Sequence, residues 1–204
     1  MASQTDATQD DIRYVRQLAE SGAHAPLLGG RYIAWWGLLL TIAYTLQHLA
    51  LSGRIGDGST IFAWIWIGFA VLGGAGQFVL LRGKSARPGS GSAGNRASRT
   101  VWMTAAAAIM SMVVGAVVAD ANGAGPATFD WTVPLAFAVY ACALTVSGAL
   151  ARDRVARLAG AGAVIMVGLS TSMILSPDRY LIAAAGVALT VLLPGVLMLR
   201  AEPR

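Results

Sequence analysis

The side chains best suited to chemistry lie near the end of the first long apolar segment, where Tyr44, Gln47 and His48 occur within five residues. Tyr44 and His48 are four residues apart and so share one face of a helix. Imidazole changes charge near neutral pH, and a neighbouring carboxylate favours its charged form. Asp120 and Asp130 bound a later loop that we expect on the same side of a membrane. The pattern therefore permits an outward-facing proton or metal site that joins His48 to one of these carboxylates.

A plainer interpretation of His48 is a histidine at the membrane interface whose ring is bonded to a neighbouring carbonyl group, and we favour it. Gln77 lies about one helical turn from the end of the second apolar segment, where we expect it to bond another helix rather than a substrate. The polar candidates therefore remain candidates only, without a catalytic, cofactor-binding or metal-binding role: Tyr44, Gln47, His48, Gln77, Asp120 and Asp130.

Tyr44, Gln47, His48 and Gln77 lie within six apolar segments of the chain, and none of the six segments contains Asp, Glu, Lys or Arg. Proton pumps, ion-coupled carriers and voltage sensors usually keep a charge inside the membrane, so the pattern argues against them. A single spanning histidine cannot supply two axial haem ligands within one chain, although a haem shared by two chains is left open. The single cysteine, Cys142, excludes an intrachain disulfide and a thiolate metal cluster. We therefore expect neither cofactor nor metal, and the sequence leans against an enzyme.

The apolar segments have 18 to 22 residues each, or roughly 27 to 33 Å of helix, which matches the hydrocarbon core of a bilayer. Charged residues make up only 12% of the chain and apolar ones 56%, which is unlike the composition of soluble domains. The sequence therefore predicts an all-α polytopic membrane protein with six transmembrane helices in one bundle. We place the spans at residues 32–51, 60–81, 101–119, 132–151, 158–175 and 180–199.

Basic residues are distributed unequally between the loops. With the N-terminus inside, thirteen of the fifteen Lys and Arg residues lie on the inner side, and only Arg54 and Arg179 lie outside. The positive-inside rule then places both termini in the cytoplasm. The Ala, Gly and Arg content is typical of a GC-rich bacterial genome, so we expect a bacterial inner membrane. The net charge of +5 is explained by this topology, and nucleic acid is not an expected partner.

Three segments outside the spans complete the predicted organisation. Residues 1–31 form a cytoplasmic arm with one short amphipathic helix, because Ile12, Val15 and Leu18 recur at helical spacing. This helix can pack against the inner loops, lie on the membrane or dock a partner. Residues 82–99 are rich in Gly and Ser and are expected to be a flexible cationic linker. Residues 200–204 are a short cytoplasmic tail.

Small residues at helical spacing follow one face of several spans. Such faces allow close helix packing, so we expect the third to sixth spans to form a tight bundle and the bulkier first two spans to face lipid. Pro194 is expected to kink the sixth span. The small-residue stripes are Ala107, Ser111, Gly115 and Ala119; Ala143, Ser147 and Ala151; Gly168 and Ser172; and Ala184 and Ala188.

These observations leave three classes of function. The first is a non-enzymatic subunit or regulatory component of a membrane assembly, which contacts lipid and binds other subunits or its own copies through small-residue faces. The second is a small transporter or channel for a neutral or weakly polar solute. The third, a membrane enzyme, would need convergent polar groups that the sequence does not place together. A water-lined cavity between the third and sixth spans would favour transport, whereas a dry bundle with an exposed small-residue face would favour a subunit.

Overall fold

The computed structural model describes residue 13 and residues 28–56, 59–82 and 91–202. Throughout these ranges the regular structure is helical, and six helices are long and apolar enough to cross a membrane. The predicted all-α bundle of six spans is therefore confirmed, and its apolar helices indicate a multi-pass membrane protein. The short helix expected in the N-terminal arm lies outside the described residues, as does most of the arm.

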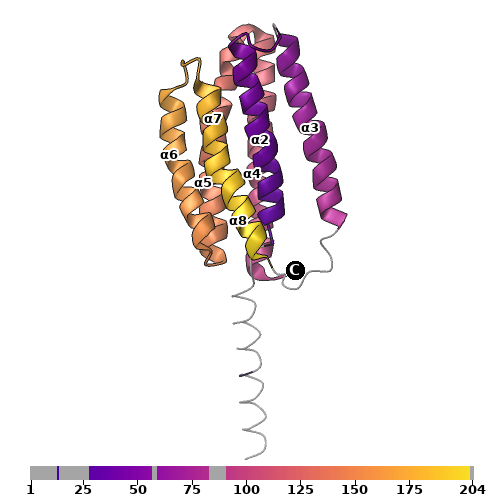
Figure 1. Cartoon of the computed structure of the whole chain (residues 1–204), viewed down its shortest axis with the longest axis vertical. Coiled ribbons are helices and arrows are strands. Elements are labelled where there is room, and N and C mark those ends of the chain that lie inside the picture. The colour runs from indigo at the N-terminus through magenta and orange to yellow at the C-terminus, as the bar shows by residue number, and fades with distance from the viewer. Residues whose placement is uncertain (1–12, 14–27, 57–58, 83–90, 203–204) are drawn as a thin grey trace, which may run out of the picture.

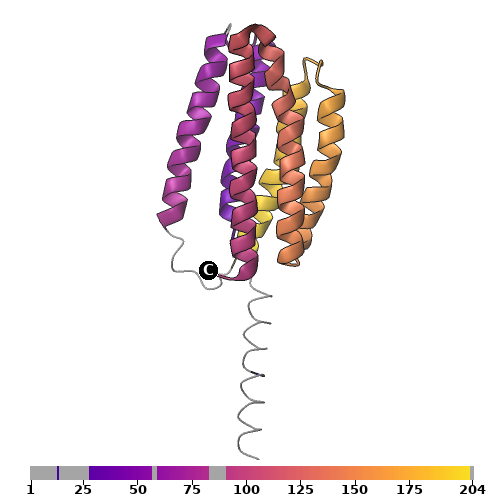
Figure 2. The same ribbon diagram turned by 180° about the vertical axis from the view of Figure 1, so that it is seen from behind.

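The helices run alternately up and down the long axis of the molecule (Figures 1 and 2). Asp130 lies at one end of the bundle and Glu202 at the other, and we name the two ends after these residues. The first five spans are α2 (Gly30–Leu51), α3 (Ser59–Arg82), α4 (Ala93–Ala119), α5 (Thr132–Leu150) and α6 (Arg154–Ser172). The sixth consists of α7 (Arg179–Val187), the π-helical turn η3 (Ala188–Leu192) and α8 (Leu193–Ala201); η1 (Asp120–Ala124) and η2 (Pro126–Trp131) join α4 to α5.

The first span packs between α3 and the sixth span, so the expectation that the first two spans alike face lipid holds better for α3 than for α2: 39% of the most apolar window of α2 is buried, against 6% for α3. α2 packs against α3, α7, η3 and α8. Glycines permit this position: a Cβ on Gly37 would lie 2.7 Å from the Leu192 backbone nitrogen, and one on Gly195 would lie 2.4 Å from the Ala34 nitrogen. The first and last spans therefore touch backbone to backbone. Glu202 adds a bond between them, because its carboxylate accepts from the Gly30 amide at 2.9 Å.

The interior of α5, α6 and the sixth span is filled by small and aliphatic side chains. Gly148 and Gly160 let α5 and α6 approach closely, since a Cβ on Gly160 would lie 2.3 Å from the Thr145 hydroxyl. Ser147 of α5 is buried and shares a 2.9 Å hydrogen bond with Ser98 of α4. The fully buried apolar residues of these three spans are Ala143, Leu144, Ala156, Ala163, Ala183 and Val187.

The small-residue stripe of α4 faces outward, which corrects the expectation that it packs inside the bundle. Ala107, Ser111 and Gly115 are all exposed, and a Cβ on Gly115 would meet no neighbouring atom within 4 Å. α4 instead uses its Ser98, Ala105 and Ala116 face, the three positions buried on this helix, and its principal contact is with α5.

Two local features of the sequence shape the ends of these spans. α4 begins at Ala93, inside the expected 82–99 linker, because the Ser92 hydroxyl accepts from the Asn95 amide and caps the helix. In the sixth span the π-helical turn η3 comes directly before Pro194. Proline lacks an amide hydrogen, and a widened turn accommodates the lost helical hydrogen bond.

Candidate functional site

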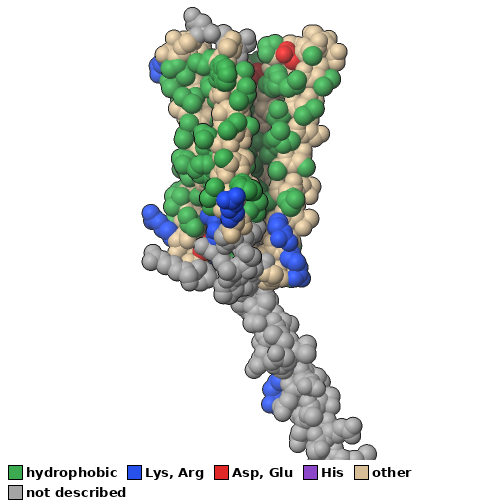
Figure 3. All heavy atoms as spheres, turned by 90° about the vertical axis from the view of Figure 1, so that its right-hand side faces the viewer, with side chains coloured by type: hydrophobic (Ala, Val, Ile, Leu, Met, Phe, Trp, Pro, Cys, Tyr) green, Lys and Arg blue, Asp and Glu red, His purple; other side chains and the backbone are tan. Residues whose placement is uncertain are grey.

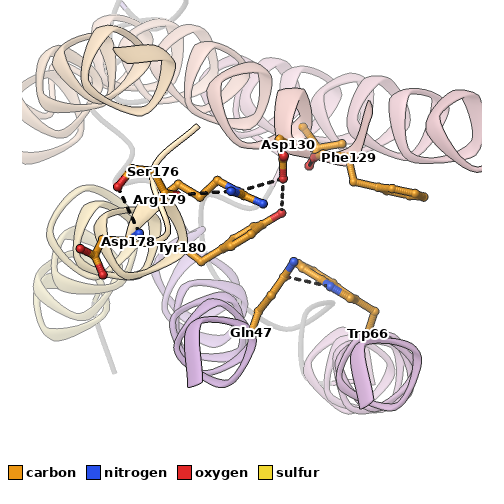
Figure 4. A network of polar contacts seen from close by, with 9 residues as sticks. Gln47, Trp66, Phe129, Asp130, Ser176, Asp178, Arg179 and Tyr180 are labelled. Atoms are coloured by element: carbon orange, nitrogen blue, oxygen red, sulfur yellow. Dashed lines mark hydrogen bonds and ion pairs between the residues drawn. The ribbon is translucent and has the colours of Figure 1, made fainter. Parts of the chain in front are cut away.

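The strongest polar cluster lies at the Asp130 end, where η2 meets the first turn of α7 (Figure 4). The Tyr180 hydroxyl donates to Asp130 Oδ1 at 2.8 Å. Arg179 Nε lies 2.9 Å from the same oxygen and forms an ion pair with it. The contact does not count as a hydrogen bond, because the Nε–H bond does not point towards the oxygen. The Asp130 side chain is only 13% exposed and that of Arg179 only 22%. The cluster therefore joins the η2 connection to the sixth span through a largely buried ion pair.

An aromatic layer lies directly beneath this cluster. Tyr44 of α2, only 5% exposed, stacks on Tyr180 with ring centroids 6.0 Å apart and meets the edge of Trp66 of α3 at 5.7 Å. The Arg179 guanidinium lies 5.0 Å from the centroid of the Tyr180 ring. Ring pairs of this geometry are attractive beyond the area that they bury. Tyr44 is thus part of the packing that holds α2, α3 and α7 together.

The two glutamines bind tryptophans in a reciprocal arrangement between α2 and α3. At the Asp130 end, Trp66 of α3 donates its indole N–H to Gln47 of α2 at 3.1 Å. Towards the Glu202 end the direction reverses, and Trp36 of α2 donates to Gln77 of α3 at 3.1 Å. The expectation that Gln77 bonds another helix is confirmed. These bonds tie α3, which packs mainly on α2, at two separate heights of the membrane.

His48 and Asp120 are the candidates that the structure separates from the cluster. His48 Nδ1 has no hydrogen-bond partner among the described residues, so the favoured bond to a neighbouring carbonyl is not found at this atom. Nδ1 lies 3.9 Å from Asp178 Oδ1, so the alternative pairing with Asp120 or Asp130 is not found either. The Asp178 side chain is 59% exposed, which leaves this pair weak and screened by water. Asp120 is exposed where α4 passes into η1.

The cluster connects helices, and its polar groups are occupied by each other. Asp130 is engaged by a tyrosine hydroxyl and a guanidinium, and each glutamine carbonyl by an indole N–H. Among the residues that the structure describes, no three His, Cys, Asp or Glu side chains are grouped as a metal site would require. Tyr180, Arg179 and Trp66 were missed from the sequence. The Asp178–Arg179–Tyr180 run at the start of the sixth span was the available signal.

Comparison of the chain with models of protein families, with curated proteins and with solved structures finds no match.

Proposed function

We propose that this protein is a non-enzymatic subunit or interaction component of a membrane assembly, and that α4 is the helix through which it binds. The observation that carries the proposal is the exposed small-residue face of α4, formed by Ala107, Ser111 and Gly115. Within a bilayer, small residues allow a partner helix to approach closely and gain van der Waals contacts that large side chains would block.

The unequal burial of α4 and α5 supports the same proposal. Only 11% of the most apolar window of α4 is buried inside the chain, against 56% for the span that contains α5. The interior beside α5 is occupied by residues with no exposed area, such as Leu144, Ala163 and Val187. The filled interior argues against a pathway for a solute, and the open outer face of α4 favours contact with a partner helix, as expected of a subunit.

The test compares two glycine substitutions that are equivalent within the isolated chain. Neither Gly115 of α4 nor Gly74 of α3 has an atom within 4 Å of an added Cβ, so each leucine variant should fold. We expect Gly115→Leu to reduce the size of the complex extracted in mild detergent, measured by size exclusion with light scattering, while Gly74→Leu preserves it.

Two results would contradict the proposal. One is a wild-type protein that elutes as a single chain with no partner and carries a neutral solute across a vesicle membrane, which would favour a transporter. The other is an equal effect of both leucine variants on the size of the complex.

A further inference from the structure

A shallow apolar groove of about 500 Å³ runs along α2 between α3 and α8, in the half of the molecule nearer the Glu202 end. Its floor comes from α2 and its walls from Val79 of α3 and from Val196 and Leu199 of α8. Both walls are open to the surroundings, since Val79 is 66% exposed and Leu199 is 41% exposed. Because the groove lies along apolar spans, the surroundings are the lipid of the bilayer.

The floor of the groove changes chemically along its length. Arg31, Trp35 and Leu38 all line it, and their spacing of four and then three residues places them on one face of α2. Going into the membrane, this face presents a guanidinium, then an indole, then an aliphatic side chain. A phospholipid presents its groups in the matching order: phosphate, ester and acyl chain.

The end of the groove nearer Glu202 carries a group of cationic side chains. The Arg31 side chain has no ion pair or hydrogen bond among the described residues. Two further arginines lie at the same end, Arg82 where α3 finishes and Arg200 in the last turn of α8. The Glu202 carboxylate at this end is 8% exposed and accepts from the Gly30 amide. Figure 3 shows arginine side chains gathered at this end of the molecule, below a band of hydrophobic side chains.

Trp35 lies in the middle of the groove. Its indole lines the groove and packs against Gly76, where an added Cβ would lie 2.3 Å from Nε1. Nε1 is covered by the protein, so the ring offers its apolar surface to a ligand. An indole ring suits the depth between the phosphate and the acyl chains of a lipid.

We propose that this groove binds one anionic phospholipid of the bilayer, with an acyl chain between Val79 and Val196 and its phosphate at Arg31. Guanidinium groups form charge-assisted hydrogen bonds to phosphate, and cationic side chains near the membrane surface attract anionic lipids. The bound lipid fills the space between α3 and the rest of the bundle. It therefore contributes to holding α3, which the protein fastens mainly through α2.

The test measures lipid binding to the full chain in detergent by native mass spectrometry. The probes are phosphatidylglycerol and phosphatidylcholine with identical acyl chains. We expect the first phosphatidylglycerol to bind more tightly than the first phosphatidylcholine. Arg31→Gln should weaken phosphatidylglycerol binding about fivefold and leave phosphatidylcholine binding unchanged. Arg154→Gln is the matched control, because Arg154 is an exposed arginine at the same end but outside the groove.

A second pair of variants tests the acyl-chain position. Val79→Trp fills the groove and should weaken the binding of both lipids, whereas Val71→Trp on the same helix, 63% exposed and outside the groove, should not. Equal affinity of the wild-type protein for the two lipids would overturn the proposal. So would equal effects of Arg31→Gln and Arg154→Gln, or a chain dimer that Val79→Trp abolishes while lipid binding persists. An unchanged melting midpoint in each variant confirms that the compared proteins are folded.

Discussion

Asp130 and Asp178 lie at the same end of the molecule, but their surroundings differ sharply. Asp130 accepts from Tyr180 and pairs with Arg179 in a largely buried position, whereas Asp178 is mostly exposed beside His48. Hydrogen bonds to a charged group contribute more to the free energy of unfolding when water is excluded from them. The stability of this end of the bundle therefore depends on Asp130.

We expect Asp130→Asn to lower the free energy of unfolding by about 1.5 to 3 kcal/mol, because it leaves Arg179 without its charged partner. Asp178→Asn should cost less than about 1 kcal/mol, as exposed ion pairs do. Thermal unfolding of both variants in detergent measures the difference. Equal losses for the two aspartates would show that burial of the Asp130 cluster does not govern its strength.

Among single residues, the sequence predicted the role of Gln77, missed Tyr180, Arg179 and Trp66, and gave the wrong partners for His48. Gln77 bonds another helix as predicted, because a glutamine inside an apolar span has few ways to satisfy its amide other than a neighbouring helix. For His48 Nδ1, neither the favoured carbonyl bond nor the alternative pairing with Asp120 or Asp130 is found, because its surroundings depend on how α7 is placed beside α2. The contact between Tyr180 and Asp130 joins residues 50 positions apart, and no local spacing encodes it.

Of the six spans that the structure describes, α3 is the least buried. Only 6% of its most apolar window is buried. Two tryptophan–glutamine bonds and a hydrogen bond from the Tyr32 hydroxyl to the Leu80 carbonyl hold it to α2. Gly73 allows the Trp36 ring to lie against the helix, since an added Cβ would be 2.4 Å from that ring. The next residue, Gly74, faces open space.

These adjacent glycines provide a matched prediction. Gly73→Leu should destabilise the protein by about 1 to 3 kcal/mol, because the leucine and the Trp36 ring cannot occupy the same space. Gly74→Leu adds the same side chain to the same helix and should leave the melting midpoint unchanged. Pulsed electron spin measurements between labels on α2 and α3 should show a longer distance in the Gly73 variant alone. Identical behaviour of the two variants would place the α2–α3 contact elsewhere.

Which face of each helix packs against protein was harder to predict from the sequence than where the helices lie in the chain, for a physical reason. Every span is apolar on all sides, so hydrophobic periodicity cannot distinguish a face that meets protein from one that meets lipid. Small residues were the remaining guide, and they mark close approach by any helix, within or outside the chain. This is why Ser111 and Gly115 were assigned to the interior although both are exposed, and why α2 was expected to face lipid as much as α3 does although it packs between α3 and the sixth span.

For the whole molecule, the charge distribution predicted from the sequence appears as a real asymmetry between the two ends. Eight of the described arginines lie at the Glu202 end, namely Arg31, Arg82, Arg96, Arg99, Arg152, Arg154, Arg157 and Arg200. Arg54 and Arg179 lie at the Asp130 end. By the positive-inside rule, this distribution supports the expectation that the Glu202 end faces the cytoplasm.

The proposed orientation predicts the outcome of reporter fusions. A reporter active only in the cytoplasm should work at residue 90 and after Arg204, and a reporter active only outside should work near residue 125. The expected cause is the excess of arginine in the loops at the Glu202 end. Strong activity of the outside reporter at residue 90 would reverse the orientation.

Site-specific photo-crosslinking in native membranes shows directly whether α4 carries the binding face of a membrane subunit. A photoreactive residue is placed in turn at Ser111 on α4 and at Val71 on α3, where the exposed neighbours Ile67 and Phe78 are bulky; both positions are exposed. We expect a discrete protein adduct from position 111, either a second copy of the chain or another subunit, and only lipid adducts from position 71. Lipid adducts alone from both positions would contradict this expectation.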